Sequence, residues 1–410
     1  MPPQLRQETR GPAAIVIDGA QQALSVARNL GRSGVPVYAL TSSSEGVRFS
    51  RYARWLPMAD GGSPKSWERF LLDPASDFLA GSVLLACTDS AIQLVARNSE
   101  QLSRKFLIEE GDREIRLCLL DKFRTYEKAK EARIPIVAYE LLESFLQLDS
   151  LAERLRFPLI IKPLYSPDSE ALGAKFVMVN NRNELSEKGR RLLRLGVPSV
   201  AMEFVPGGDD LLCSYYTYMD ENSHPLVEFT KRLLRRSPMH TGIGCYHVTD
   251  WNPEIAELGR RFFQHVKLKG IGNIEFKRDR RDGQFKVIEA NARFTSADAV
   301  VTKSGIDLAT ITYNRLTHRP LPPVRPYRKG LVLWLPAEDI RAFFQLRALG
   351  KITFGRWLSS LLRVRQLPYF SWRDPLPSFY VNAVRTVRLA RMAKPRIVVS
   401  IREFGGGTRR

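Results

Sequence analysis

Glu289-Ala290-Asn291-Ala292-Arg293 is the most informative stretch of this 410-residue sequence. It follows the apolar run Phe285 to Ile288, which is typical of a buried strand. Side chains two residues apart on a strand point to the same face, so Glu289, Asn291 and Arg293 share one face. Carboxylate and carboxamide oxygens are suitable ligands for Mg²⁺, and the arginine could meet the charge that develops on a transferred phosphoryl group.

A second acid, Glu275, lies upstream within Gly272-Asn273-Ile274-Glu275-Phe276. The stretch Asp279 to Gly283 between the two acids is typical of a hairpin loop, which would bring Glu275 and Glu289 together on neighbouring strands. The pattern predicts a site for a metal and a nucleotide, with Glu275, Glu289 and Asn291 as the metal ligands. The alternative is a hairpin whose charges are solvated.

A lysine also ends an apolar run, in Phe157-Pro158-Leu159-Ile160-Ile161-Lys162-Pro163. Its position predicts the end of a buried strand, where a lysine needs an anionic partner such as a nucleotide phosphate. The alternative is a strand-end lysine that only reaches solvent. Further along stands Met202-Glu203-Phe204-Val205-Pro206-Gly207-Gly208-Asp209, whose two glycines permit a sharp turn.

Taken in this order, these motifs resemble the ATP-grasp superfamily, specifically its carboxylate–amine ligases near the carbamoyl-phosphate-synthase-like and D-aspartate-ligase-like branch. The resemblance covers about Ala14 to Pro323. It implies an α/β (α+β) ATP-grasp fold with an N-terminal Rossmann-like pre-ATP-grasp domain. The matched positions are the E-x-N-x-R motif at Glu289, Asn291 and Arg293, the first metal acid at Glu275, the nucleotide lysine at Lys162, and the adenine hinge with its ribose acid at Met202 to Asp209.

The hinge has a physical basis beside the resemblance. Glu203, Phe204 and Val205 would present edge backbone groups to adenine. The turn that follows would place Asp209 or Asp210 near the ribose hydroxyls, and the sequence does not decide which. Taken alone, Pro-Gly-Gly-Asp is more often simply a turn.

A basic segment, Lys231 to Pro238, stands where related ligases carry K-L-R-Q-x-P. Arg235 matches the arginine of that motif, whereas Leu233 replaces its lysine. Guanidinium groups before the Gly-x-Gly loop at 242–244 suit triphosphate or acyl-phosphate oxygens. The alternative for Lys231, Arg232 and Arg236 is a solvated basic strand.

Two further lysines are candidates for phosphate contacts. Lys175 ends Tyr165 to Lys175, the counterpart of the loop that covers the phosphates in the family, although here it carries one glycine and two acids. The pair Asp121-Lys122 begins the predicted helix Asp121 to Ala132, which opens the ATP-grasp part in the family. Lys122 could contact the nucleotide from that side; the alternative is a lysine that makes no contact with the nucleotide.

The N-terminal part predicts a βαβ unit with parallel strands, formed by Ala13 to Asp18, Gln21 to Gly34 and Val35 to Thr41. It lacks G-x-G-x-x-G, so a dinucleotide site is not supported. A further strand, Val83 to Ala86, precedes Thr88-Asp89-Ser90 and a helix through Arg97. Asp89 could orient a substrate at the strand end or serve as a helix N-cap.

The composition indicates a soluble protein of more than one domain. No apolar run reaches the roughly 18–20 residues of a membrane span, and Met1 to Pro12 lacks the apolar segment of a secretory signal. Cysteines 87, 118, 213 and 245 show no Cys-x-x-Cys spacing, which indicates reduced thiols in a cytoplasmic location. Cys245, His247 and His240 are three candidate zinc ligands without a fourth, so a zinc site is not expected. We expect a disordered N-terminus (1–12), a pre-ATP-grasp domain (13–120), an ATP-grasp domain (121–323, lid about 135–205), a basic helical C-terminal region (324–404) and a flexible tail (405–410).

The C-terminal region from Val324 onward carries eighteen lysines and arginines against four acids, a net +14 of the chain's +20. Helical spacing runs from Ile340 to Leu362, with interruptions near Gly350 and Gly355. We expect its apolar face to pack on the catalytic core. The alternative is that this region contacts the inner face of an anionic membrane, because a basic segment that also carries Trp and Phe can lie on such a surface. No nucleic-acid motif is present, so nucleic acid is not an expected partner.

The sequence thus predicts an ATP-dependent ligase that joins a small carboxylate and an amine through an acyl phosphate. ATP and Mg²⁺ (or Mn²⁺) are the implied cofactors. Lys162 and Lys175 would hold the phosphates, and Arg235 and Arg293 would neutralise the transferring group. The alternatives are a nucleotide-binding regulator with little turnover and a membrane-surface assembly factor. The sequence determines neither the substrates nor the oligomeric state.

Overall fold

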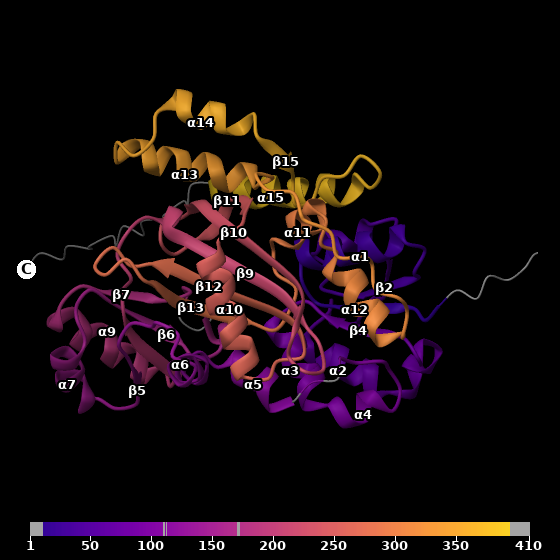
Figure 1. Ribbon diagram of the computed structural model, residues 1–410, viewed down its shortest axis with the longest axis horizontal. Coiled ribbons are helices and arrows are strands. Elements are labelled where there is room, and N and C mark those ends of the chain that lie inside the picture. Colours follow the sequence, from indigo (N-terminus) through magenta and orange to yellow (C-terminus); the bar gives the residue numbers. More distant parts are fainter. Residues whose placement is uncertain (1–10, 110, 112, 170–172, 394–410) are drawn as a thin grey trace, which may run out of the picture.

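Three β-sheets organise the part of the chain that the computed structural model describes, which is residues 11–109, 111, 113–169 and 173–393. In Figure 1 the N-terminal sheet with its helices and the small sheet of residues 139–203 lie on opposite sides of a large central sheet. The C-terminal helices lie above all of them. The expected disordered and flexible ends, 1–12 and 405–410, fall outside the described residues except for Gly11 and Pro12.

The N-terminal sheet is a four-stranded parallel layer in the order β3-β2-β1-β4. Strand β1 is buried along its whole length because all four of its side chains are apolar. The predicted βαβ unit is confirmed by the parallel pairing of β1 with β2. The elements are β1 (Ala14–Ile17), α1 (Gln21–Arg32), β2 (Val37–Leu40), η1 (Gly46–Phe49), β3 (Arg54–Trp55), α2 (Pro64–Leu72), η2 (Pro74–Leu79), β4 (Val83–Ala86), α3 (Asp89–Arg97), α4 (Ser99–Ser103) and α5 (Arg113–Leu120).

The small sheet is antiparallel, in the order β5-β8-β6-β7, and lies within the range expected for the lid. Helix α6 leads into it, and the Asp121 side chain caps that helix by accepting a hydrogen bond from the Arg124 amide. Two helices cover one face and share its leucine-rich core. The elements are α6 (Lys122–Glu131), β5 (Tyr139–Leu142), α7 (Gln147–Arg154), β6 (Leu159–Pro163), η3 (Ser166–Asp168), β7 (Val177–Val179), α9 (Arg182–Arg194) and β8 (Ser199–Glu203).

The large sheet has seven strands in the order β13-β12-β9-β10-β11-β14-β15. One face packs on α10 and the other on α11, α12 and the N-terminal unit, so the site hairpin β12–β13 stands between two cores. The elements are η4 (Asp209–Leu211), β9 (Leu212–Met219), β10 (Pro225–Ser237), β11 (Ile243–Asp250), α10 (Pro253–His265), β12 (Gly270–Arg278), β13 (Phe285–Asn291), α11 (Asp298–Ser304), α12 (Leu308–Leu316), β14 (Val332–Trp334) and β15 (Val364–Gln366).

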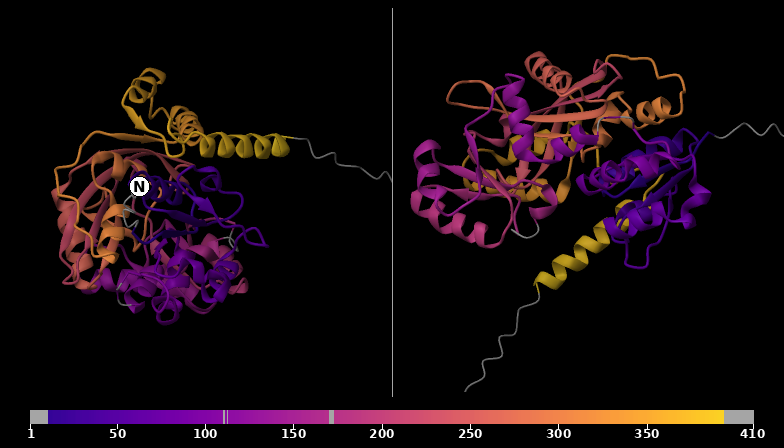
Figure 2. Two further views of the ribbon diagram at one scale, coloured as in Figure 1. Left: turned by 90° about the vertical axis from the view of Figure 1, so that its right-hand side faces the viewer. Right: turned by 90° about the horizontal axis from the view of Figure 1, so that it is seen from below.

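The C-terminal region is not purely helical, because two of its segments extend the large sheet. Strand β14 pairs with β11, and β15 pairs with β14 in parallel. Helix α13 (Pro336–Ala348) ends just before Gly350, as predicted, but Gly355 lies inside α14 (Phe354–Leu361) and does not interrupt it. Helix α15 (Leu376–Ala393) follows and extends beyond the body of the fold in Figure 2.

Buried ion pairs attach this region to both other parts of the chain. The Arg28 guanidinium of α1 donates to Asp374 at 2.9 Å, and both side chains are almost fully buried. Asp339 of α13 is fully buried and accepts hydrogen bonds from Arg235, Trp334 and Trp357. The large sheet therefore continues past residue 323, where we placed a domain boundary.

Candidate functional site

The hairpin β12–β13 aligns the two predicted acids. Glu275 lies directly opposite Glu289, and Asn273 lies opposite Asn291. Residues opposite one another in an antiparallel pair share a face, so both carboxylates and Asn291 line one cavity of about 420 Å³. The predicted hairpin is confirmed.

The carboxamide of Asn291 is oriented by its neighbours. Asn273 Nδ2 donates to the Tyr215 carbonyl at 3.1 Å, which turns its own Oδ1 toward Asn291. Asn291 Nδ2 donates to that oxygen at 3.4 Å. The remaining amide atom, Asn291 Oδ1, is therefore the one that can meet a cation in the cavity.

Lys162 ends β6 inside the same cavity and is 8% exposed. Its ammonium lies 3.4 Å from the Tyr126 hydroxyl. Burial lowers the pKa of Lys162 to about 8, although the charge of Glu289 opposes this shift. A lysine in this setting gains from an anion that restores the stability of its charged form. The alternative of a solvent-reaching lysine is wrong.

The predicted adenine hinge forms one wall of the cavity, which Glu203, Phe204 and Val205 all line. The Glu203 carboxylate is held by the Arg156 amide and by Arg281. Lys277 donates to the Val205 carbonyl at 2.8 Å and lies 4.7 Å from the Phe204 ring centre. The wall therefore has a fixed backbone and an aromatic side chain.

The structure distinguishes the two candidate ribose acids. Asp209 is buried, lines the cavity and accepts a hydrogen bond from the His240 amide at 3.0 Å. Asp210 is exposed and lines a neighbouring cavity instead. The 3₁₀ turn η4 directs the two side chains apart.

Arg235 does not face the cavity, which corrects the sequence prediction. Its guanidinium donates to Asp339 at 2.5 Å and lies 3.9 Å from the Tyr246 ring centre, in the interface with α13 and α14. The cavity is lined by Lys231, Leu233 and then Arg236. Strand β10 changes register on both sides of Arg235, so a β-bulge interrupts the alternation of side chains.

Arg236 occupies the position predicted for Arg235. One of its terminal nitrogens donates to the His240 carbonyl at 3.1 Å. Its Nε is buried and, among the described residues, has no hydrogen-bond partner. Because an unpaired buried donor is unfavourable, the group is suited to an anion entering the cavity.

A buried lysine–histidine pair, which the sequence did not reveal, lies deeper in the same cavity. Lys231 donates to Ser214 Oγ at 3.1 Å and lies 3.3 Å from His247 Nδ1. Burial lowers the pKa of Lys231, and burial together with that lysine holds the pKa of His247 well below its usual value. The interpretation of Lys231 as part of a solvated strand is wrong.

Arg293 lies at the junction with the N-terminal unit. Its Nε donates to Asp89 Oδ1, and both residues line the cavity. The helix N-cap is Thr88 rather than Asp89, so the carboxylate of Asp89 is committed to the arginine. Burial opposes the charge of Arg293, but Asp89 outweighs burial and raises the arginine's pKa above its usual value.

Two more predicted lysines reach the cavity from the lid side. Lys122 lies 3.3 Å from Ser166 Oγ at the start of the covering loop, and Lys175 is exposed at its other end. Apart from Arg235 and Asp210, the cavity thus brings together all the predicted site residues: Lys122, Lys162, Lys175, Glu203, Phe204, Val205, Asp209, Glu275, Glu289, Asn291 and Arg293.

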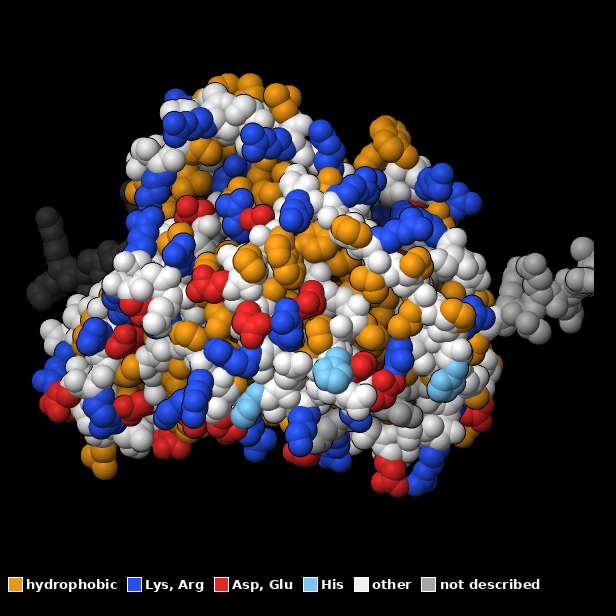
Figure 3. Space-filling model, in the orientation of Figure 1, with side chains coloured by type: hydrophobic (Ala, Val, Ile, Leu, Met, Phe, Trp, Pro, Cys, Tyr) orange, Lys and Arg blue, Asp and Glu red, His pale blue; other side chains and the backbone are white. Residues whose placement is uncertain are grey.

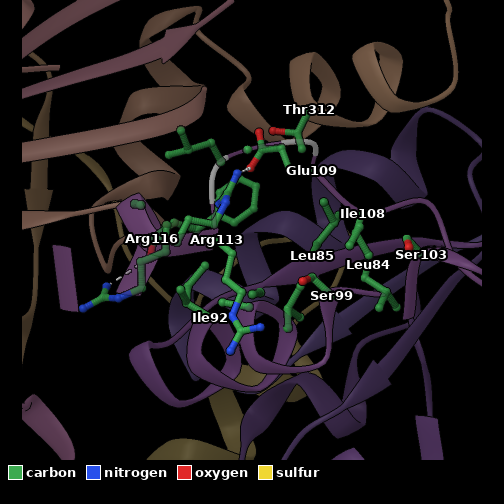
Figure 4. Close-up of a pocket in the computed structure, with 18 of the residues that line it drawn as sticks. Leu84, Leu85, Ile92, Ser99, Ser103, Ile108, Glu109, Arg113, Arg116 and Thr312 are labelled. Carbon is green, nitrogen blue, oxygen red and sulfur yellow. Dashed lines mark hydrogen bonds and ion pairs between the residues drawn. The ribbon is translucent and has the colours of Figure 1, made fainter. Parts of the chain in front are cut away.

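A second, largely apolar cavity of about 270 Å³ adjoins the first at Arg293. Leu84, Leu85, Ile92 and Ile108 of the N-terminal unit surround it in Figure 4, with Glu109 and Arg116 joined by an ion pair at its edge. It lies between the N-terminal sheet and the large sheet. Arg293 is therefore the side chain common to both spaces.

The cysteines take no part in a metal centre in the described structure. All four are free and buried. No group of three or more His, Cys, Asp or Glu side chains in the described residues is arranged to hold a metal. The two carboxylates and one carboxamide of the hairpin are a smaller set, which suits a cation that takes its other ligands from phosphate and water.

Part of the chain, including the hairpin β12–β13, is similar in sequence to known proteins. Residues 250–317 match the model of the carbamoyl-phosphate synthase L chain, ATP binding domain. The D-aspartate ligase of Enterococcus faecium (strain Aus0004) is 26% identical over 252 residues, which is 58% of this chain and 59% of that protein. The D-alanine–D-alanine ligase of Xylella fastidiosa (strain Temecula1) is 25% identical over 184 residues, which is 42% of this chain and 57% of that protein.

Solved structures show the same fold. The L-amino acid ligase from Bacillus licheniformis superimposes with a TM-score of 0.58 at 17% identity, over 75% of each chain. The N5-carboxyaminoimidazole synthetase from Staphylococcus aureus complexed with ADP gives 0.60 at 18% identity, over 77% of this chain and 80% of that one. The chain therefore has the ATP-grasp fold that these structures share, as the sequence resemblance implied.

The chain spans less than two thirds of the length of the two ligases that it matches in sequence. In the described residues, no helix is both long and apolar enough to cross a membrane.

Proposed function

We propose that the chain is an ATP-dependent carboxylate–amine ligase that forms an amide or peptide-like bond and releases ADP and phosphate. One observation carries the proposal. The acids of the E-x-N-x-R hairpin, buried Lys162 and Arg236 all line one cavity, which therefore offers candidate metal ligands together with cations for a polyphosphate. The two sequence relatives, both named ligases, support it.

Glu275, Glu289 and Asn291 would hold Mg²⁺ or Mn²⁺. The donor set fits, because it offers two carboxylates and a carboxamide oxygen whose orientation Asn273 fixes. When bound, the cation would offset the negative charge that develops during phosphoryl transfer.

ATP itself would be held between the hinge and the lid. Adenine would lie against Phe204 and the Glu203–Val205 backbone, and the ribose would lie near Asp209. Lys162, Lys122 and Lys175 would hold the phosphates from the lid side. Burial of Lys162 makes this contact strong, because water does not compete for its ammonium.

The reaction would proceed in two transfers. A substrate carboxylate oxygen attacks the γ-phosphorus, and the bond from that phosphorus to ADP breaks. The amine nitrogen then attacks the carbonyl carbon of the acyl phosphate, phosphate leaves with the electron pair of the carbon–oxygen bond, and the nitrogen loses a proton. Arg293 and Arg236 would neutralise the transferring group and the tetrahedral oxyanion.

A screen of amino acids and small carboxylates, alone and in pairs with amines, tests the proposal through ADP release. A carboxylate and amine pair should stimulate Mg²⁺-dependent ADP release and yield equal amounts of amide and phosphate. Tight ATP binding with no ADP release from any pair would instead favour the nucleotide-binding regulator.

A further inference from the structure

The segment 340–373, from α13 to the loop after β15, combines positive charge with exposed apolar side chains. It contains no aspartate or glutamate and seven basic residues. Five of the basic residues are exposed around the hairpin of α13 and α14: Arg347, Lys351, Arg356, Arg363 and Arg365. The segment therefore presents one sign of charge to its surroundings.

One side of α14 is fixed to the protein by polar contacts. The Tyr246 hydroxyl donates to the Ser360 carbonyl at 2.7 Å, and Arg235 donates to Ser360 Oγ at 3.1 Å. Trp357 donates to Asp339 at 2.9 Å and stacks on Phe343 with ring centres 4.6 Å apart. The helix is thus held in one orientation.

The apolar stripe of α14 is exposed to solvent. Phe354, Leu358 and Leu362 are spaced four residues apart, so they form one stripe, and they are 52%, 50% and 78% exposed. Phe344 of α13 and Leu349 in the turn add further exposed apolar surface. Figure 3 shows hydrophobic and basic side chains together on this raised part of the molecule. The expectation that the apolar face of this region packs on the catalytic core is correct for Ala342 and Phe343, which are buried, and for half-buried Trp357, but wrong for the stripe.

We propose that this face of α14 docks on an anionic membrane surface. The arrangement fits a bilayer because the apolar side chains can enter the interfacial layer while the surrounding arginines and Lys351 contact lipid phosphates. The charge also argues against a second copy of the same face, which would bring two acid-free basic surfaces together. The proposal is independent of the ligase reaction, since none of these side chains lines the nucleotide cavity.

Sedimentation of the full-length protein with vesicles tests the proposal. Vesicles that contain phosphatidylglycerol should pellet the protein, pure phosphatidylcholine should not, and salt of about 0.5 M should release it because surface charge is then screened. Leu358→Asp with Leu362→Asp should weaken binding at least about tenfold, because charges would replace the apolar anchors. The fold should persist, because α14 buries no residue completely.

Leu146→Asp is the matched control, since Leu146 is 93% exposed in the lid and should have no effect on vesicle binding. Charge reversal at Arg356 and Arg363 should reduce binding without altering the apolar stripe. Absence of pelleting with anionic vesicles, or equal pelleting by the Leu358→Asp, Leu362→Asp protein, would overturn the proposal. So would an oligomer that dissociates in that variant, because the face would then join copies of the chain.

Discussion

Arg293 Nε donates a hydrogen bond to Asp89 Oδ1 at a distance of 2.5 Å, although 204 residues separate the two in the chain. Asp89 begins α3 in the N-terminal unit, and Arg293 follows the strand that carries Glu289 and Asn291. The carboxylate raises the pKa of the arginine against the effect of burial. The N-terminal unit therefore positions a charge for the site and does not merely adjoin it.

Asp89→Asn should lower kcat by roughly 10–100-fold, the usual effect of removing a group that orients a reacting one. The ATP dissociation constant should change little, because Lys162 and the hinge remain. Steady-state ADP release and calorimetric ATP titration measure the two effects. Asp77→Asn serves as the control, since it breaks an ion pair with Lys105 on the surface of the same unit. An unchanged kcat would show that Asp89 does not position Arg293 for the reaction.

Lys162→Ala should weaken ATP binding by about 2–3 kcal/mol, the value of a charge-assisted hydrogen bond to a buried partner. Arg293→Ala should act mainly on the rate, because its charge is needed as the phosphoryl group moves.

The affinity for ATP should also depend on pH. The pKa of Lys162 is lowered to about 8, so its ammonium loses its proton as the pH rises through that value and wild-type affinity should fall between pH 7 and 9.

The pH dependence should be shallower in Lys162→Ala, where Lys277, whose pKa burial also lowers to about 8, still titrates in this range. Calorimetric ATP titration at several pH values measures it. Equal affinity losses in Lys162→Ala and Arg293→Ala, or parallel pH profiles in wild type and Lys162→Ala, would show that the roles are assigned wrongly.

The neighbours Arg235 and Arg236 should differ in what they affect. Arg235→Gln leaves Asp339 as a buried carboxylate without its cation, so the free energy of unfolding should fall by about 3–5 kcal/mol. Arg236→Gln should leave stability within about 1 kcal/mol and lower kcat instead. Chemical denaturation and ADP release, measured on both variants, separate the two. The reverse pattern would restore the role that sequence spacing gave to Arg235.

Asp298 should make stability depend on pH. It is 2% exposed at the start of α11, and burial raises its pKa to about 7. A carboxyl with a raised folded-state pKa contributes stability that is complete below its unfolded pKa near 4 and is lost as pH rises through about 7. Asp298→Asn should therefore be more stable than wild type at pH 8, by up to about 4 kcal/mol, and should show little difference at pH 4.

Thermal or chemical denaturation at both pH values tests this effect. Asp149→Asn, at a carboxylate that is 86% exposed, should show no such change. Equal stability of Asp298→Asn and wild type at pH 8 would contradict a raised pKa in the folded protein.

Sequence periodicity was sufficient for the metal hairpin and for Lys162. Glu275, Glu289 and Asn291 lie where the hairpin pairs without a register shift, from Asn273 opposite Asn291 to Glu275 opposite Glu289, so alternation fixes their face. A lysine near the end of a buried strand is likewise restricted in where it can point. The same alternation could have identified Lys277, two residues after Glu275, although it was not considered. The βαβ unit was predictable because its strands are short, apolar runs separated by a helix.

The errors arose where local structure departs from regular periodicity. The bulge in β10 moved the cavity-facing arginine from Arg235 to Arg236, and no residue pattern marks that bulge. The C-terminal region is largely helical, as predicted, but strands β14 and β15 were missed because three residues each are too few to show alternation. The pairing of Arg293 with Asp89 and of Lys231 with His247 depends on tertiary packing, which spacing alone does not reveal.

ADP release by Glu289→Gln, with Mg²⁺ and an active carboxylate–amine pair, tests the ligase proposal most directly. Glu289 lies near the end of β13 at the cavity and is only partly buried, so the variant should keep the wild-type melting temperature. Its turnover should fall by about a thousandfold or more, because one carboxylate offsets much of the cation's charge. Unchanged ADP production by a folded Glu289→Gln protein would contradict the assignment of this cavity as the site of phosphoryl transfer.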